Sequence, residues 1–308
     1  MKCMIVPGCR NCKRDNTVLF KNKLEYYAFL TLAGLFQKIG ITRTRKTARF
    51  LGALFYYIVP IRKKTVIENL KIAFPKKSNK EILELTKNSY KNFATTFAEL
   101  LVLQTLTKEE LTGILDLGES KEMIEKYYNS GKSFFLLTGH FGNWELTASF
   151  PLFFSRRFNA MAKAMRNPFV SDWTNKSREK FGSSVVLLGP SLREIFKLLK
   201  ENEVILVVGD QRGPRESIRV NFFNRPTAVF TGTAALAVRT STPIVMILIA
   251  RKKDFNYKII AQELKYDDLT CPDDEKIQII CQRYFSFLED VVKQYPEQWF
   301  WMHKIWKY

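Results

Sequence analysis

Residues 133–146 read SFFLLTGHFGNWEL, and here the chain changes from a helical pattern to an α/β pattern. The apolar run at 133–138 has the length of a buried strand. Gly139 and Gly142 allow a tight bend after it, and the residues that follow favour a helix. His140 would therefore lie just beyond the carboxyl end of a strand, where open α/β sheets place their ligands.

Short apolar runs alternate with helical patterns from this stretch to the C-terminus. Such alternation predicts an α/β fold, with a mixed, mostly parallel sheet that helices flank and largely bury. The predicted strands are residues 133–138, 160–163, 184–188, 204–208, 218–222, 243–250 and 257–261. The predicted helices in this half are residues 144–154, 168–181, 192–200, 231–240 and 274–294.

The preceding part of the chain, residues 24–103, has a helical pattern without period-two alternation. Ser78 and Glu81 form a capping box that should open a helix ending near residue 103. Thr107 and Glu110 should open a shorter helix in the same way.

These patterns predict one folded unit preceded by a tail. We expect a flexible extension at residues 1–22 and a single domain at 23–308. Within that domain, residues 23–130 should form a mainly helical section packed on an α/β core at 131–308.

The charge of the chain points to a polyanionic partner. Lys and Arg number 49 and Asp and Glu 30, a formal net charge of +19. Nucleic acid and an anionic membrane surface both fit this excess, as do solvated lysines of a basic proteome.

Two apolar runs, residues 26–37 and 50–61, carry basic residues at their edges. As helices each would cover roughly 18 Å, short of a bilayer core of about 30 Å. Lying flat in the membrane interface fits them better, although the second fits a core-facing helix equally well. Residues 1–20 lack the apolar centre of a signal peptide.

Five cysteines are too scattered for a disulfide framework. Cys3, Cys9 and Cys12 have a spacing that suits zinc, but no fourth ligand follows nearby, while Cys271 and Cys281 lie far away. We expect reduced thiols and no metal site.

His140 and Glu145 are the best candidate catalytic pair. Five positions separate them, which is awkward on one helix but possible across a strand-to-helix turn. A neutral imidazole can take the proton of a hydroxyl that attacks a carbonyl, and a carboxylate behind the ring fixes its tautomer. Backbone N–H groups near Gly139 and Gly142 would hold the oxyanion. A buried structural histidine beside an unrelated surface acid is the alternative.

Residues 139–145, GHFGNWE, resemble the H-x4-E/D motif of the lysophospholipid acyltransferase superfamily. The surrounding chain, from about residue 24 onward, resembles one branch, the late (lauroyl/myristoyl-type) acyltransferases of lipid A biosynthesis. Further motifs that carry this likeness are ENLKIAFP at 68–75, NP at 167–168, GDQRGP at 209–214, NFFNRP at 221–226, TGTAALA at 231–237 and PEQWFWMHKIW at 296–306.

The resemblance implies a fold like that of glycerol-3-phosphate acyltransferase. It further implies transfer of a fatty acyl chain from acyl-acyl carrier protein to a hydroxyl of an anionic saccharolipid, at the cytoplasmic face of the bacterial inner membrane. No cofactor or metal is implied, and the protein would be monotopic, anchored through its N-terminal helices. His140 becomes the general base, Glu145 its orienting partner, and Asp210 a supporting or acceptor-positioning acid.

One position departs from the family pattern. An arginine usually follows the next strand, and here the counterpart is Lys163, with Arg166 three residues on. Arginine grips a phosphate or oxyanion through two N–H groups, whereas lysine acts as a point charge. Either residue is a candidate for the cation of the site. The alternative is that both are simply solvated basic residues beside a strand.

Arg212, Arg215 and Arg225 cluster in sequence around Phe222 and Phe223. Cations beside aromatic rings suit an amphiphile with a phosphate head and an acyl tail, but solvated loop arginines have the same pattern.

Several rings near these motifs have two possible roles. Phe141, Trp144, Phe222 and Phe223 either line an acyl channel or belong to the core. His303, in the tryptophan-rich C-terminal motif, fits a packing role best.

Two alternatives to the lipid A precursor remain at this stage. The acceptor could instead be a lysophospholipid, an aminolipid or a mannosylated glycolipid, because pocket shape decides that choice. A more remote alternative is a non-enzymatic basic protein that binds nucleic acid, although no helix-turn-helix, zinc-finger or RNA-binding signature occurs.

Overall fold

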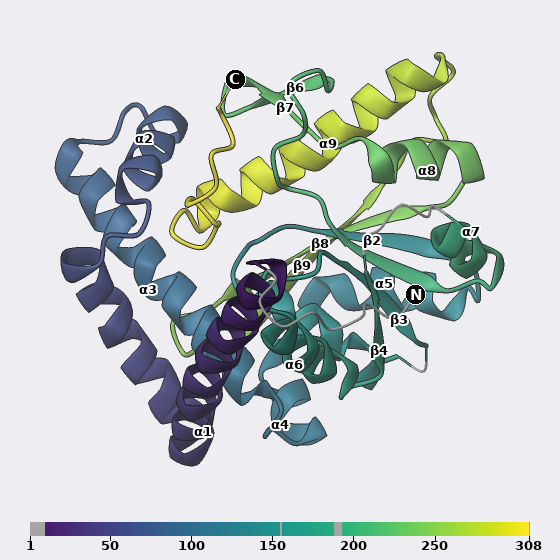
Figure 1. The fold of residues 1–308 in the computed structure, drawn as a ribbon. Coiled ribbons are helices and arrows are strands. Elements are labelled where there is room, and N and C mark those ends of the chain that lie inside the picture. Colours follow the sequence, from purple (N-terminus) through teal and green to yellow (C-terminus); the bar gives the residue numbers. More distant parts are fainter. Residues whose placement is uncertain (1–9, 155, 188–192, 308) are drawn as a thin grey trace.

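The computed structural model describes residues 10–154, 156–187 and 193–307, with side chains from Thr17 onward. Its centre is a seven-stranded sheet of order β1-β9-β8-β2-β5-β3-β4 (Figure 1). From β8 to β4 neighbouring strands are parallel, and β9 runs antiparallel to β8. The strands are β1 (Leu115–Asp116), β2 (Phe134–Thr138), β3 (Phe158–Ala162), β4 (Ser183–Leu187), β5 (Val204–Val208), β8 (Ile244–Arg251) and β9 (Tyr257–Leu264).

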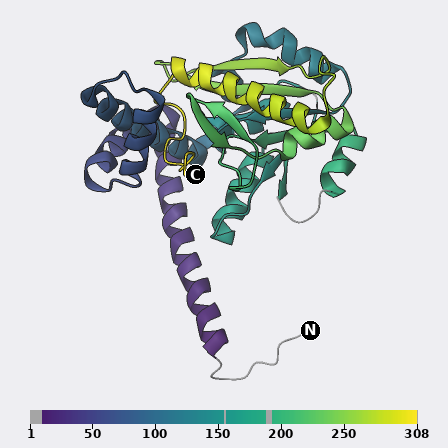
Figure 2. The ribbon, with the colours of Figure 1, turned by 90° about the horizontal axis from the view of Figure 1, so that it is seen from above.

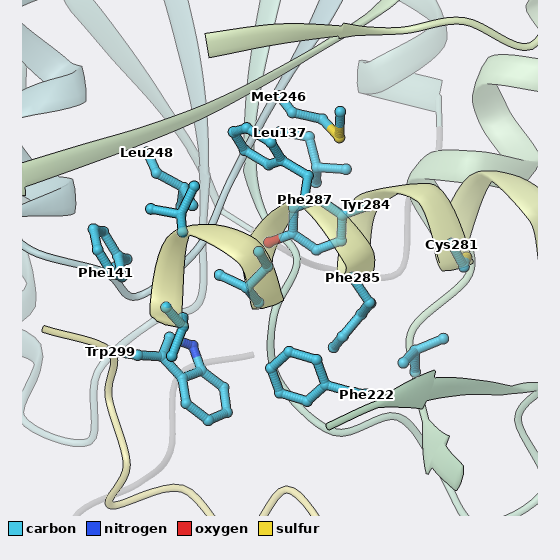
Figure 3. Close-up of a cluster of buried hydrophobic side chains, with 14 of the residues drawn as sticks. Leu137, Phe141, Phe222, Met246, Leu248, Cys281, Tyr284, Phe285, Phe287 and Trp299 are labelled. Carbon is cyan, nitrogen blue, oxygen red and sulfur yellow. The ribbon is translucent and has the colours of Figure 1, made fainter. Parts of the chain in front are cut away.

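Helices cover both faces of the sheet (Figure 1). One face carries α7 (Arg193–Lys200), α8 (Gly232–Thr240) and α9 (Asp273–Gln294). Figure 3 shows side chains from β2, β8 and α9 meeting in the core beneath them. The other face carries α4 (Lys108–Gly113), α5 (Lys121–Asn129), the 3-10 segments η1 (Gly118–Ser120) and η2 (Trp144–Leu152), and α6 (Pro168–Glu179).

Strand alternation separates the two cores. On β2, Phe135 and Leu137 pack toward α9, whereas Phe134 and Leu136 pack toward η2. All five residues of β2 are buried, as a sheet covered on both faces requires.

The N-terminal section consists of α1 (Arg10–Ile58), α2 (Lys63–Ala73) and α3 (Asn79–Leu103). Helix α1 is broken at Gly40, which adopts a φ of 75°, and its N-terminal part extends beyond the rest of the fold (Figure 2). The two predicted capping boxes, which begin at Ser78 and Thr107, are both formed. They fix the starts of α3 and α4 because the side chain of each cap accepts an otherwise unpaired backbone N–H.

The α/β prediction is confirmed, with four differences in its elements. The short strand β1 was not predicted, because it lies in the section expected to be mainly helical. The helix that was expected to start near residue 24 begins at Arg10, so the proposed extension is helical from there, and residues 1–9 lie outside the described part. Residues 144–152 form a 3-10 helix instead of an α-helix, with Pro151 inside it. Of the hairpin of β6 (Arg219–Phe222) and β7 (Arg225–Ala228), only β6 corresponds to a predicted strand, and β7 contains Pro226, a residue that is rare in strands.

Large apolar side chains are exposed along α1. In its first part Phe20 is 71% exposed and Leu24 62% exposed. In the second apolar run, Gly52 and Tyr56 pack against α3, as a core-facing helix requires, while Phe50 is exposed. No described helix is both long enough and apolar enough to cross a membrane.

Candidate active site

His140 and Asp210 meet because they follow neighbouring parallel strands. Thr138 of β2 pairs with Val208 of β5, and each candidate residue stands two positions beyond its paired residue. Both side chains therefore leave the same edge of the sheet at the same height.

The Asp210 carboxylate, which is 2% exposed, holds the imidazole through two contacts. His140 Nδ1 lies 2.7 Å from Oδ1, and the His140 backbone N–H donates to Oδ2 at 2.7 Å. Trp299 Nε1 also donates to Oδ2, at 2.8 Å. An ionised carboxylate can only accept, so Nδ1 carries the hydrogen and Nε2 is the nitrogen that can accept a proton.

Burial and neighbouring charges shift the pKa values of both His140 and Asp210. Burial by itself lowers the pKa of His140, but the charge and hydrogen bond of Asp210 outweigh it, and the net pKa is raised above 6.5. Burial would raise the pKa of Asp210, yet the contacts of His140 and Trp299 hold it below its ordinary value. Asp210 thus stays ionised, and its charge favours the protonated form of the His140 imidazole.

Glu145 does not hold the imidazole, so the predicted His140–Glu145 contact is replaced by His140–Asp210. Arg178 of α6 binds Glu145 through two hydrogen bonds, from Nε and Nη2, each 2.8 Å long. Trp144 Nε1 adds a third at 3.1 Å. The charge of Glu145 still raises the pKa of His140, and the charge of Arg178 lowers the same pKa.

Three backbone N–H groups of the turn, those of His140, Phe141 and Gly142, already have acceptors within the protein. The donor and acceptor pairs are His140 N with Asp210 Oδ2 at 2.7 Å, Phe141 N with Gly139 O at 2.7 Å, and Gly142 N with Gln298 O at 2.9 Å. These three groups therefore shape the turn and are not directed at a ligand.

Gly142 is required for steric reasons. It has a φ of 55°, and a Cβ there would lie 1.8 Å from the carbonyl oxygen of Ile249. A Cβ on Gly139 would lie 3.2 Å from Asp210 Oδ2 and 3.3 Å from the Tyr284 hydroxyl, so that a side chain there would crowd the aspartate.

A cavity of about 730 Å³ adjoins the imidazole. His140, Glu145, Arg178 and Gln211 contribute polar groups to its wall. Most of the remaining lining is apolar and comes from β2, β5, α7, α8 and α9: Phe135, Leu137, Ile195, Ile205, Val207, Ala234, Leu236, Ile280, Cys281 and Phe285. This combination suits a long apolar ligand with its reactive end at His140.

The structure separates the two candidate cations after β3. Lys163 is exposed and lines the cavity. Arg166 is exposed as well, and it binds Glu25 of α1 at 2.9 Å instead of lining the cavity. Residues 139–143, between β2 and η2, are here called the catalytic turn. The cation beside this turn is Arg178, which the sequence reasoning did not single out.

The arginines near Phe222 do not line the cavity. Arg212 donates to the Lys304 carbonyl at 2.7 Å, and its backbone N–H donates to His303 Nε2. Arg215 and Arg225 are exposed beside the β6–β7 hairpin.

Among the aromatic candidates, Trp144 lines the cavity. Phe141, Phe222 and Phe223 are buried in the core cluster shown in Figure 3 or next to it. His303 accepts a backbone hydrogen bond, in keeping with the packing role expected for it.

One sequence signal for Arg178 was available. Ser171 and Thr174 are small residues on the buried face of α6, and Arg178 follows them at helical spacing. A cation on such a face needs a buried anionic partner. Trp299, in contrast, is far from the site in sequence, and no local pattern identifies it.

The fold and this site together define an α/β protein with a histidine–aspartate pair beside a largely apolar cavity. Residues 12–308 match the family of bacterial lipid A biosynthesis acyltransferases, and the chain belongs to that family. It is also similar to the phosphatidylinositol mannoside acyltransferases of two Mycobacterium tuberculosis strains, ATCC 25618 / H37Rv and CDC 1551 / Oshkosh. Identity is 24% over 163 residues in each case, so the match spans about half of this chain and half of each relative (51%).

The pH dependence of activity should reveal the His140–Asp210 pair. A general base works only when neutral, so kcat/KM should rise with pH through a His140 pKa above 6.5. Asp210→Asn removes the charge that raises this pKa and leaves the burial that lowers it. The rise should then move to lower pH, while the plateau falls about a hundredfold.

Asp268→Asn is the matched control, because it removes an exposed carboxylate that binds Arg283, and neither residue lines the cavity. This variant should change neither the pH at which kcat/KM rises nor the plateau value of kcat/KM. An unshifted profile in Asp210→Asn would contradict the assignment of Asp210 as the partner of His140.

Proposed function

We propose that this protein transfers a fatty acyl chain from acyl-acyl carrier protein to a hydroxyl of a lipid A precursor or a related anionic glycolipid. The observation that carries the proposal is the pairing of a partly exposed His140 with a buried Asp210 at the wall of a largely apolar cavity of about 730 Å³. Membership of the lipid A acyltransferase family supports the reaction class. The nucleic-acid alternative gives this pair and cavity no role.

The imidazole acts as the general base. As the acceptor hydroxyl attacks the thioester carbonyl, His140 Nε2 takes its proton, and Asp210 stabilises the imidazolium that forms. The tetrahedral intermediate then collapses, the carbon–sulfur bond breaks, and His140 returns the proton to the departing thiolate. The step balances without a cofactor or metal.

Glu145 and Arg178 are assigned a supporting role beside the reacting carbonyl. Both side chains line the cavity, and their exposed fractions are only 9% and 17%. In such a poorly hydrated place a fixed ion pair can orient a polar substrate at little reorganisation cost. Lys163 at the cavity rim is the proposed contact for a phosphate or carboxylate of the substrate.

The acceptor has a second candidate. The similar mycobacterial proteins are named phosphatidylinositol mannoside acyltransferases, which favours a mannosylated glycolipid as the alternative acceptor. Incubating the purified protein with labelled acyl-acyl carrier protein and both classes of acceptor, followed by mass spectrometry of the lipids, separates the two.

His140→Ala should abolish acyl transfer while the protein still folds. Loss of the base costs about a hundredfold to ten-thousandfold in rate. His303→Gln is the control on the second histidine, because the amide oxygen can still accept the Arg212 N–H. It should keep near wild-type turnover. His140→Ala with more than a few per cent of wild-type turnover would refute His140 as the base.

Chain-length selectivity should respond to Ala234, a buried residue of α8 on the cavity wall. Ala234→Leu fills part of the space we assign to the acyl tail. The ratio of long-chain to short-chain turnover should fall at least tenfold, and less for Ala234→Val. Ala235→Leu, one residue along and outside the lining, should leave the ratio unchanged. Equal ratios in all four proteins would place the acyl tail elsewhere.

The protein is further proposed to lie on the cytoplasmic face of the bacterial inner membrane. Exposed Phe20 and Leu24 on α1 would insert into the interface, while Lys21 and Lys23 contact anionic headgroups. The positive net charge would also attract acidic acyl carrier protein.

Vesicle sedimentation checks the membrane proposal. Phe20→Glu/Leu24→Glu should weaken binding to anionic vesicles at least about tenfold, because a buried large apolar side chain contributes about 1.5–3 kcal/mol. Leu187→Glu, which changes an exposed leucine on the edge strand β4, is the control and should bind normally. Unchanged binding by the double variant would exclude this part of α1 as the anchor.

A further inference from the structure

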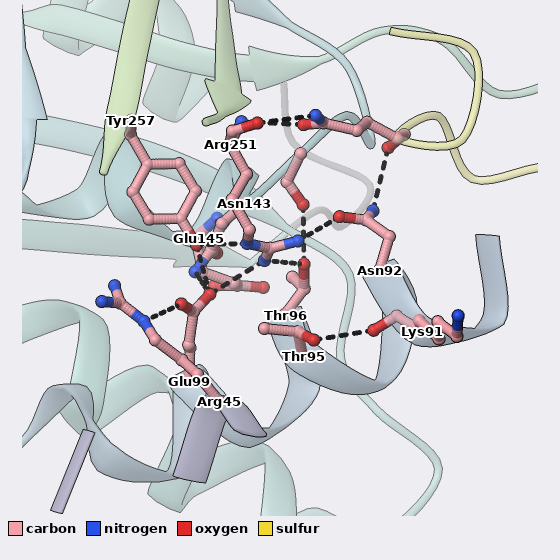
Figure 4. Close-up of polar contacts among 12 residues, drawn as sticks. Arg45, Lys91, Asn92, Thr95, Thr96, Glu99, Asn143, Glu145, Arg251 and Tyr257 are labelled. Carbon is pink, nitrogen blue, oxygen red and sulfur yellow. Dashed lines mark hydrogen bonds and ion pairs between the residues drawn. The ribbon is translucent and has the colours of Figure 1, made fainter. Parts of the chain in front are cut away.

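A buried polar cluster surrounds Glu99 of α3 and does not line the cavity (Figure 4). Its members, here called the Glu99 cluster, are Arg45 from α1, Thr96 and Glu99 from α3, Arg251 at the end of β8 and Tyr257 at the start of β9. Glu99 is 1% exposed. Elements distant in sequence therefore meet at one carboxylate.

The Glu99 carboxylate is fully occupied by donors. Arg45 Nε donates to Oε1 at 2.6 Å, and Arg251 Nη2 donates to Oε2 at 2.9 Å. The Tyr257 hydroxyl also donates to Oε2. Burial would raise the pKa of Glu99, but the two guanidinium groups outweigh it and the pKa is lowered. The carboxylate is thus held in its charged form.

The Glu99 cluster contacts the catalytic turn at two points. Thr96 Oγ1 donates to the Gly142 carbonyl at 2.7 Å. The Asn143 side chain donates to Glu99 Oε2 at 2.8 Å, and its oxygen accepts the Glu145 backbone N–H at 3.2 Å. Asn143, the N-cap of η2, consequently connects Glu99 to the first turn of η2 beside the cavity.

The C-terminal segment also binds the same turn. Gly142 N donates to the Gln298 carbonyl, while the Gln298 side chain bonds both the N–H and the carbonyl of Arg251. Thr96 also accepts from Arg251 Nη2 at 2.8 Å. Arg251 therefore links Thr96, which binds the Gly142 carbonyl, to Gln298, which binds the Gly142 N–H.

Stability alone is a weak explanation for such a cluster. Well-packed apolar residues generally stabilise a core as well as a buried ion pair does, because desolvation offsets the attraction between the charges. Directed hydrogen bonds do provide a defined geometry. Here that geometry reaches the turn that carries His140 and leads into η2, where Glu145 lies.

We propose that the Glu99 cluster positions the catalytic turn, with Thr96 and Asn143 as positioning residues that act through Gly142 and Glu145. The inference rests on the acyl-transfer function proposed above. Thr96 and Asn143 touch no reacting atom, and their effect is to fix where the chain leaves His140 and where η2 begins.

Thr96→Val tests the inference because it keeps the shape of the side chain and removes the donor to Gly142. We expect kcat to fall about tenfold with KM within twofold of wild type. Thr96→Ser restores the hydroxyl and should restore kcat. Thr86→Val is the matched control: Thr86 is buried in the same helix, and its hydroxyl bonds only within that helix, to Ile82. It should lower the melting temperature similarly without lowering kcat.

NMR titration of the two imidazoles measures the pKa of His140 without relying on the activity assay. The charged groups that act on the pKa of His140 include Asp210, Glu145 and Arg178, and His303 is electrostatically coupled to it, so a displaced turn changes the titration midpoint of His140. The midpoint should shift in Thr96→Val but not in Thr86→Val.

The possible outcomes separate the two proposals. If the wild-type protein transfers no acyl group, the proposed function fails, yet a shifted His140 titration still supports positioning by Thr96. If Thr96→Val and Thr86→Val lose equal stability and neither kcat nor the titration changes, the Glu99 cluster is only structural and the inference is wrong.

Discussion

The register between β2 and β5 is the constraint on which the site depends. Pairing of Thr138 with Val208 brings His140 and Asp210 to the same height at one edge of the sheet. Parallel strands that are buried on both faces cannot slip without moving apolar side chains out of two cores. The hydrogen bond between a base and its carboxylate is thereby held by the same packing that stabilises the domain.

Around this pair, the catalytic turn is supported from several directions. Asp210 and Trp299 hold His140, Arg178 holds Glu145, and the Glu99 cluster holds the residues between them. Each support comes from a different element, and most of the polar atoms involved are buried. Buried polar groups need all their partners, so the arrangement defines one geometry for the turn and disfavours alternatives.

Local patterns predicted most of the secondary structure. Apolar runs located the core strands of the large sheet to within two or three residues, and two capping boxes located the starts of α3 and α4. The errors occurred where local preference and tertiary context disagree. Pro226 is tolerated in β7 because that strand belongs to a two-stranded hairpin, and η2 is a 3-10 segment whose end contains a proline.

The sequence by itself determined the α/β class, the strand-end position of His140 and the family. Only the tertiary structure decided which acid the imidazole contacts. Glu145 is near in sequence but binds Arg178, whereas Asp210 is distant and binds His140. The reason is that partner choice follows strand order: β2 and β5 are adjacent in the sheet although β3 and β4 lie between them in the chain. Periodicity specifies which residues form strands and which faces they bury, but not which strands become neighbours.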